Sequence, residues 1–294
     1  MPNTEPDLAG LLGRAEAVLG RLEALLPAPV AATNWQARAF RWRKRGQAGY
    51  LQAVPHPHRI RLSDLKGVDE QKKLLDRNTR QFVDGRPANN VLLTGARGTG
   101  KSSLVKALLN KYGGRGLRLI EVDKHDLVDL PDIAEQLYRR RERFILYCDD
   151  LSFEAEEPGY KALKVALDGT VSGSADNLLV YATSNRRHLM PEFMAENLET
   201  RHAGGEVHPG EVTEEKISLS ERFGLWLSFY PFDQDEYLLI VEYWLEVFRV
   251  PAVDPEIVRR EALQWALARG SRSGRVAWQF ARDWAGRHGE NRAS

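Results

Sequence analysis

The segment from Gly95 to Ser102 constrains the fold of this chain more strongly than any other part of the sequence. It reads GARGTGKS and lies between an apolar run, VLLT, and a helical pattern, SLVKALLNKY. Glycines at these spacings let successive backbone N–H groups surround a phosphate, and the N-terminus of the following helix adds partial positive charge. The sequence therefore predicts an α/β fold built around a phosphate-binding loop.

Two side chains of this loop have distinct expected roles. Lys101 reaches the β- and γ-phosphate oxygens, and the hydroxyl of Ser102 coordinates Mg²⁺. The neighbouring residues contribute mainly through their backbone. The predicted phosphate-binding residues are Gly95, Ala96, Arg97, Gly98, Thr99, Gly100, Lys101, Ser102 and Ser103.

Four nearly continuous apolar runs predict a parallel sheet around the loop, at residues 90–94, 117–122, 144–148 and 178–183. Runs of this kind are typical of strands that helices cover on both faces. The third run is followed directly by Asp149 and Asp150, which places both carboxylates at the carboxyl end of a strand, where open α/β sheets bind ligands. We expect Asp149 to bind Mg²⁺ and Asp150 to orient or deprotonate an attacking water.

Asn185 follows the fourth run, 36 residues after Asp149, which leaves room for a crossover helix at residues 160–167. Its amide can donate to a γ-phosphate or position a water, and a terminal asparagine can equally cap a helix. Arg222, in SERFG, and Arg275, in SGR, are candidates for stabilising charge on a transferred phosphoryl group, although both could be surface residues.

The chain divides into three expected parts. Residues 1–54 form an N-terminal helical extension, residues 55–231 form the α/β core, and residues 232–294 form a small all-helical lid with helices at 235–248, 255–268 and 274–287. The polar, glycine-rich stretch 203–215 reads as an exposed mobile loop.

The N-terminal extension carries two features. Leucines and other apolar residues between Leu8 and Leu26 line one stripe of a helix, which either docks on the body of the chain or forms a short self-association seam. Docking on the body is the expected outcome. The basic run 38–45 is interleaved with aromatics, so it either binds nucleic acid or forms a solvated helix face with Phe40 and Trp42 buried.

Composition sets the broad class of the protein. Among 294 residues, 42 Lys and Arg nearly balance 41 Asp and Glu, which leaves a net charge of +1. The overall charge therefore gives no reason to expect a nucleic acid or membrane as an obligatory partner. The single cysteine, Cys148, excludes a disulfide framework and a cysteine-rich zinc module, and is typical of a reducing cytoplasm. The most apolar stretch, 225–248, contains five acids, so we expect no membrane span.

The motifs GARGTGKSS, FILYCDD, ATSN, SERFG and SGR resemble, in order and approximate spacing, the Walker A, Walker B, sensor 1, arginine finger and sensor 2 motifs of the AAA+ ATPase superfamily. The resemblance covers about residues 62–287. More narrowly, CDDLSFE, LKVALDG and YATSNRRHL resemble a bacterial domain-of-unknown-function family of AAA-type ATP-binding proteins.

This resemblance implies a P-loop core with a helical lid that binds ATP and Mg²⁺ and hydrolyses ATP. It implies catalytic roles for Lys101, Asp150, Asn185, Arg222 and Arg275. Arg275 would reach the phosphates from the lid, whereas Arg222 would face the nucleotide of a neighbouring subunit, which implies an ATP-dependent oligomer. Gly67 and Val68 resemble the segment that touches adenine.

Two departures from the superfamily pattern bear on function. Asp150 stands where most members carry Glu, which resembles replication initiators and helicase loaders and indicates slow, switch-like hydrolysis. The stretch DKHDLVD, from Asp123, has no aromatic residue where protein unfoldases carry a pore loop. We therefore expect either an ATPase that remodels a protein or nucleoprotein, or an ATP-dependent binding switch with DNA or a helicase as partner.

Overall fold

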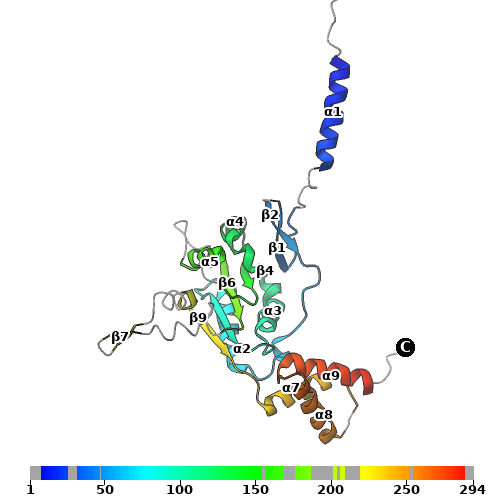
Figure 1. Ribbon diagram of the computed structural model, residues 1–294, viewed down its shortest axis with the longest axis vertical. Helices are drawn as coiled ribbons and strands as arrows, with labels where there is room; N and C mark the ends of the chain where they lie inside the picture. Colours follow the sequence, from blue (N-terminus) through cyan, green and yellow to red (C-terminus); the bar gives the residue numbers. More distant parts are fainter. Residues whose placement is uncertain are drawn as a thin grey trace, which may run out of the picture.

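The computed structural model describes residues 8–25, 32–46, 48–153, 157–168, 176–186, 201–203, 206–208, 219–251 and 254–288. Its centre is a seven-stranded sheet in the order β2-β1-β4-β5-β6-β3-β9 (Figure 1). All neighbours are parallel except β1 and β2. The strands are β1 (Ala39–Arg45), β2 (Ala48–Ala53), β3 (Val91–Gly95), β4 (Leu117–Glu121), β5 (Arg143–Cys148), β6 (Leu178–Ser184) and β9 (Leu225–Phe229).

Helices cover both faces of this sheet, as the apolar runs predict. On β5, Ile145 and Tyr147 pack in one core cluster, with residues of α2 (Asp69–Val83) and α3 (Lys101–Tyr112). The alternate side chains, including Leu146, pack in a second cluster with α4 (Leu130–Leu137) and α5 (Pro158–Asp168). Successive strand residues point to opposite faces, so both faces need apolar side chains.

The four predicted strands are confirmed as β3, β4, β5 and β6, and the predicted crossover helix is confirmed as α5. The strands β9, β1 and β2 were not predicted from the sequence. On β9, exposed and buried residues alternate, because this strand lies at the edge of the sheet. Its burial pattern differs from the continuous runs that identified the central strands.

The interpretation of residues 38–45 as a helix face is wrong, because this stretch forms β1 and pairs in parallel with β4. The expected burial of Phe40 and Trp42 is confirmed, since each is only 1% exposed. A strand places these two aromatics on one face, whereas basic residues alternate with them. The N-terminal extension is therefore helical only in part, and residues 39–53 extend the sheet.

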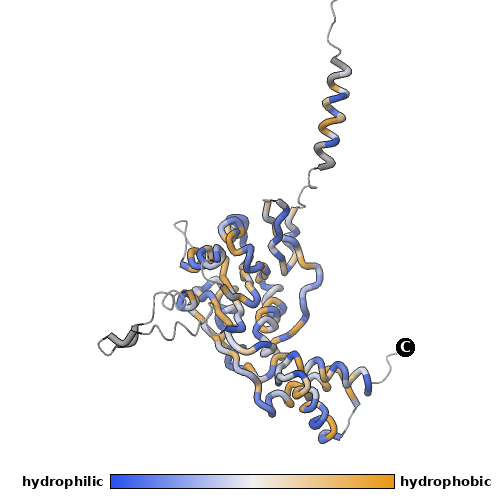
Figure 2. The backbone as a smooth tube through the Cα atoms, viewed as in Figure 1, coloured by the Kyte–Doolittle hydropathy of each residue, from blue (hydrophilic) through white to orange (hydrophobic). Residues whose placement is uncertain are grey.

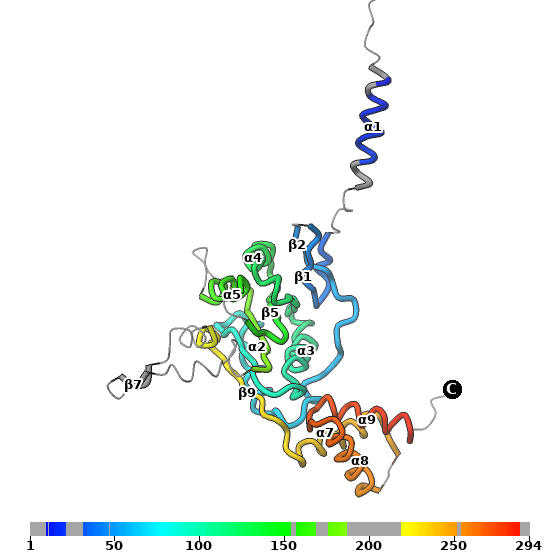
Figure 3. Tube along the Cα trace, in the orientation of Figure 1, coloured from blue at the N-terminus to red at the C-terminus, as the bar shows by residue number. Residues whose placement is uncertain are grey.

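The lid consists of α7 (Gln234–Val247), α8 (Pro255–Ala268) and α9 (Gly274–His288), which form a separate group after β9 (Figure 3). A capping box starts α7, where the Asp233 carboxylate accepts from Glu236 N at 2.8 Å and Glu236 accepts from Asp233 N at 3.0 Å. The Asp254 side chain caps α8. Gly270, at φ +62°, follows its last turn.

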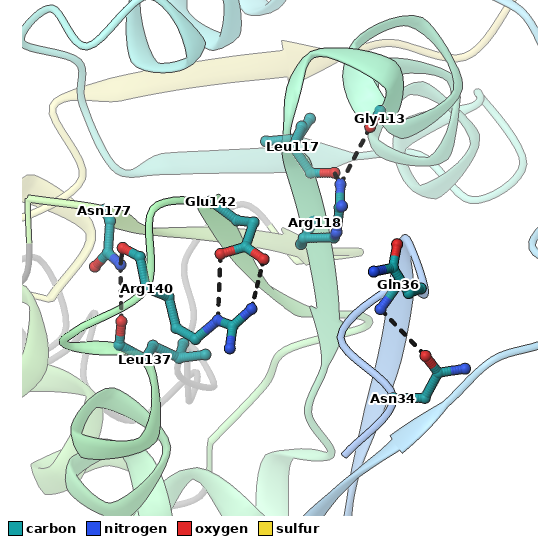
Figure 4. Close-up of polar contacts among 9 residues, drawn as sticks. All are labelled: Asn34, Gln36, Gly113, Leu117, Arg118, Leu137, Arg140, Glu142 and Asn177. Carbon is teal, nitrogen blue, oxygen red and sulfur yellow. Dashed lines mark hydrogen bonds and ion pairs between the residues drawn. The ribbon is translucent and has the colours of Figure 1, made fainter.

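Polar contacts join the segments that precede β5 and β6, at the amino ends of these strands (Figure 4). Asn177 Nδ2 donates to Leu137 O at 2.8 Å and to Arg140 O at 3.1 Å. Arg140 forms two hydrogen bonds with Glu142, which hold the pKa of that carboxyl below its usual value. Arg118, on β4, donates to the carbonyl of Gly113. These contacts are structural, whereas the carboxyl ends of the strands are open to a cavity.

The N-terminal stripe forms α1 (Leu8–Leu25), which lies apart from the α/β body (Figures 1 and 3). Leu12, Val18 and Leu19 are exposed. The expectation that this helix docks on the body is therefore wrong. Most of the stretch expected to be a mobile loop lies outside the described residues, and part of it forms a hairpin of β7 (Arg201–Ala203) and β8 (Glu206–His208).

None of the helices in the described ranges has the length and apolar character needed to cross a membrane.

Candidate functional site

The predicted phosphate loop opens into a cavity of about 650 Å³ at the carboxyl ends of β3, β5 and β6. The loop segment from Arg97 to Ser103 lines one side, and Asp149, Asp150 and Asn185 line another. The lid contributes Arg275. Residues that the sequence placed at three separate strand ends are thus brought together, because parallel strands end at the same edge of the sheet.

Lys101 lies at the bottom of this cavity and is only 6% exposed. Its ammonium donates to Gly95 O and Ala96 O, both at 2.7 Å, and to Asn185 Oδ1 at 3.0 Å. Burial lowers the pKa of Lys101 to about 8, because little water solvates the charge. Gly95 and Ala96 do not line the cavity, and they contribute these carbonyls instead.

Ser102 and Asp149 form a hydroxyl–carboxylate pair beside Lys101. Ser102 Oγ donates to Asp149 Oδ1 at 2.7 Å, and Thr183 Oγ1 donates to the same oxygen at 2.6 Å. Desolvation opposes the charge on Asp149, but the hydrogen bonds from Thr183 and Ser102 outweigh it and hold the pKa of Asp149 below its usual value. Asp149 therefore presents an anionic oxygen next to the hydroxyl of Ser102.

These two side chains fit the predicted magnesium site. Mg²⁺ in nucleotide sites is held by one or two protein oxygens, with waters and phosphates completing its shell. Within the described ranges, no group of three or more His, Cys, Asp or Glu side chains could hold a metal ion by itself. The donor set of Ser102 and Asp149 thus suits an ion that arrives with a nucleotide.

Asp150 has a backbone φ of 52°, which lies in the left-handed region. Asp150 N donates to Thr183 Oγ1 at 2.9 Å, and Asn185 Nδ2 donates to Asp150 Oδ1 at 2.5 Å. Asn185 therefore links the two charged side chains, because its amide nitrogen donates to Asp150 and its amide oxygen accepts from Lys101. A carboxylate held in this way can orient a water and accept its proton.

The lid contacts the phosphate loop directly. Gly274 N donates to Gly98 O at 2.9 Å. A Cβ on Gly98 would lie 2.8 Å from Ser273 Cβ and Oγ, and Gly98 has φ +76°, so this position requires glycine. Ser273 Oγ accepts from Val276 N and starts α9, which directs Arg275 into the cavity lining.

The other end of the cavity is apolar and aromatic. Ile60 and Leu65 line it from the core, and Ile240, Trp244 and Trp278 line it from the lid. A purine base fits such a surface, because it offers two flat apolar faces.

Gly67 and Val68, which were expected beside adenine from the family resemblance, are not among the lining residues. Val68 is 4% exposed, and Gly67, at φ +72°, lies against the ring of Phe232. Leu65 and Lys66, just before them, line the cavity instead.

Asn110, on α3, connects the phosphate end to the apolar end. Its Nδ2 donates to His58 O at 2.8 Å and to Ile60 O at 2.6 Å, and both residues line the cavity. Because α3 begins at the phosphate loop, this single amide fixes the segment from His58 to Ile60, called here the base-side segment because a purine would fit beside it, relative to the loop. No sequence motif identified this residue.

Replacement of Asn110 by alanine or by aspartate should weaken ATP binding about ten-fold, since two hydrogen bonds of about 0.5–1.5 kcal/mol each are lost. The affinity for inorganic tripolyphosphate should stay at the wild-type value, because that ligand does not reach the base-side segment. Titration calorimetry with both ligands measures the difference. An equal loss for the two ligands would mean that Asn110 only supports the fold.

Arg222 lies outside the cavity. Its Nε donates to Asp168 Oδ1, at the end of α5, at 2.6 Å. The structure therefore does not bring Arg222 together with the other predicted site residues of its own chain. A role toward the nucleotide of a neighbouring subunit stays a prediction.

Several lining residues were missed by sequence reasoning. Thr183 lies within the ATSN motif that identified Asn185, so its role could have been considered. Trp278 follows Arg275 by one helical turn, and this spacing places both on one face of α9. His58, Ile60 and Trp244 carry no local signal, because only the packing of lid against core brings them to the cavity.

The chain belongs to the protein family described as "Protein of unknown function (DUF815)", whose model matches residues 35–288. No curated protein matches the sequence. Among solved structures, the Orc1 protein of Aeropyrum pernix in complex with DNA is 19% identical, with a TM-score of 0.53, over 78% of this chain and 63% of that chain. A single-substitution mutant of Thermotoga maritima RuvB is 16% identical, with a TM-score of 0.50, over 77% and 66%.

At these identities the likeness shows the fold alone, and that fold is the AAA+ fold expected from the motifs. The chain spans just under two thirds of the length of these two structures.

Proposed function

We propose that this member of the DUF815 family binds Mg-ATP in the cavity between core and lid and hydrolyses it to ADP and phosphate. The observation that carries the proposal is the convergence on one cavity of a buried ammonium, a hydroxyl–carboxylate pair and a second carboxylate. A structural phosphate-binding loop would need only the first of these. The apolar end of the cavity supplies a surface for the base.

Each residue has a defined task in this proposal. Lys101 and the loop N–H groups bind the phosphate oxygens. Ser102 and Asp149 would hold Mg²⁺, which when bound neutralises phosphate charge and orients the γ-phosphoryl group. Asp150 orients the attacking water and accepts its proton, and Asn185 fixes the direction of the Asp150 carboxylate.

Hydrolysis would be coupled to movement of the lid. Gly274 donates to the loop carbonyl of Gly98, and Arg275 lines the cavity, so the phosphates would contact both parts of the chain. A nucleotide that binds two parts together favours their closed arrangement over others. We propose that this closure drives remodelling of a protein or nucleoprotein partner. The segment that follows β4 forms a short 3₁₀ helix, Lys124–Asp129, without an aromatic residue, which argues against polypeptide threading.

Asp150→Asn should retain Mg-ATP binding and slow turnover by about 10²- to 10⁴-fold, because the amide cannot accept a proton. Asparagine adopts the positive φ of this position readily, so the backbone should not change. Nucleotide affinity and single-turnover hydrolysis should be measured on the same preparation. Hydrolysis at the parental rate would remove Asp150 from the mechanism.

An ATP-dependent binding switch is the second candidate. The short side chain of Asp150 and the likeness to a DNA-bound Orc1 favour it. Two cations of the basic run have acidic partners within the chain, since Arg41 pairs with Glu121 at 2.9 Å and Lys44 pairs with Asp129 at 2.7 Å, which weakens the case for this run as the DNA contact.

The ATPase rate with and without single-stranded or duplex DNA separates the candidates. ATP-dependent DNA binding with negligible turnover supports the switch. Turnover that DNA does not alter supports remodelling of a protein partner. Absence of both hydrolysis and nucleotide binding would contradict the proposal.

A further inference from the structure

The helix α1 exposes an apolar stripe. Leu12, Val18 and Leu19 are 60%, 55% and 58% exposed, and the helix lies away from the α/β body. Figure 2 shows hydrophobic positions recurring along α1 between hydrophilic ones.

This stripe needs a partner for the helix to be stable. A single helix of 18 residues is marginal in water, and α1 contains three glycines, Gly10, Gly13 and Gly20, each unfavourable in a helix interior. A Cβ at Gly13 or Gly20 would meet no atom within 4 Å, so neither glycine is required by a close contact. Packing of the apolar stripe is the remaining source of stability.

The charges on α1 indicate what that partner is. At 100° per residue, Arg14 and Arg21 lie along one edge of the stripe formed by Leu12, Val18 and Leu19, and Glu16 lies along the other edge. When two copies of such a helix pack in parallel, the basic edge of one meets the acidic edge of the other. Antiparallel packing would place arginine against arginine and glutamate against glutamate, which is unfavourable.

We propose that α1 is a self-association element, in which α1 helices from two or more copies of this chain pack in parallel through the apolar stripe, with the edge that carries Arg14 and Arg21 in one copy beside the edge that carries Glu16 in the next. With Val18 at position d of a heptad, Leu12 and Leu19 both fall at position e, which widens the contact beyond a strict a and d seam. This association does not use the nucleotide cavity, so it operates without ATP and is distinct from the proposed function.

Charge reversal in the full-length chain tests the proposal by sedimentation velocity without nucleotide. The wild type should self-associate across the micromolar range. R14E/R21E and E16R/E23R should each weaken association about ten-fold or more, because both edges of every helix then carry the same sign. An equal mixture of the two variants should restore it, and so should the four-fold reversal R14E/R21E/E16R/E23R.

The direction of packing is tested by a Leu11→Cys variant under mild oxidation. Leu11 is near one end of α1, so two copies bring it together only when the helices are parallel. The native thiol should not interfere, because Cys148 is 1% exposed and burial raises its pKa to about 12. Leu11→Cys should therefore form a disulfide-linked dimer, with the two thiol protons and two electrons passing to the added oxidant.

Any of four results would overturn the proposal. The wild type could stay monomeric without nucleotide, or the charge-reversal variants could associate like the wild type. An equal mixture of the two reversal variants could fail to associate, or Leu11→Cys could form no disulfide-linked dimer. ATP affinity should be the same in all these variants, because α1 does not line the cavity. A loss of ATP binding in every variant and in the wild type would contradict the proposed function instead.

Discussion

Lys101→Ala is expected to weaken ATP binding by about 10²- to 10³-fold. The ammonium of Lys101 is buried within the phosphate loop, and removing one partner of a buried charged contact costs about 3–4 kcal/mol. The fold should survive, because the lost hydrogen bonds to Gly95, Ala96 and Asn185 are offset by relief from burying a charge. Fluorescent nucleotide titration measures the affinity, and thermal unfolding measures the stability.

The matched control is Lys73→Ala, which removes an exposed lysine from α2 and should leave ATP affinity unchanged. If folded Lys101→Ala bound ATP like the wild type, the assignment of residues 95–103 as a phosphate-binding loop would be wrong.

The sequence predicted the centre of the fold better than its edges. The strands β3, β4, β5 and β6 are buried on both faces, so each requires a continuous apolar run that is visible without any neighbour. The strands β1, β2 and β9, at or near the edges of the sheet, do not need a continuous apolar run. Basic residues of β1 alternate with Phe40 and Trp42, a pattern that was mistaken for a helix face, and Arg41 and Lys44 find their acidic partners only through tertiary contacts.

The candidate site likewise has one part that could be predicted from the sequence and one part that could not. Asp149, Asp150 and Asn185 follow strands directly, and Lys101 and Ser102 begin the helix after the loop that follows β3, so their meeting at one edge follows from a parallel sheet. The base-side wall was not predictable, because Trp244 and Ile60 come together only when the lid packs on the core. Gly67 and Val68 were expected at that wall by resemblance, but the chain turns at Gly67 and presents Leu65 and Lys66 instead.

The second large effect is expected for Arg222→Ala. An arginine that acts on the nucleotide of a neighbouring subunit lies outside its own cavity, as Arg222 does. ATP affinity should therefore stay at the wild-type value, while turnover should fall roughly 10³- to 10⁵-fold through loss of transition-state stabilisation. Steady-state hydrolysis should also depend on protein concentration in the wild type, because the complete site forms only between subunits.

Two further measurements separate this role from a structural one. Asp168→Ala removes the carboxylate that accepts from Arg222 in this structure and should leave most of the turnover, because the guanidinium is still able to act on a neighbouring subunit. Mixing Arg222→Ala with Lys101→Ala should restore part of the activity, since the second variant offers its intact Arg222 to the first variant's intact phosphate loop. If Asp168→Ala were as inactive as Arg222→Ala and mixing restored nothing, Arg222 would act by holding α5, and ATP-dependent assembly would need another cause.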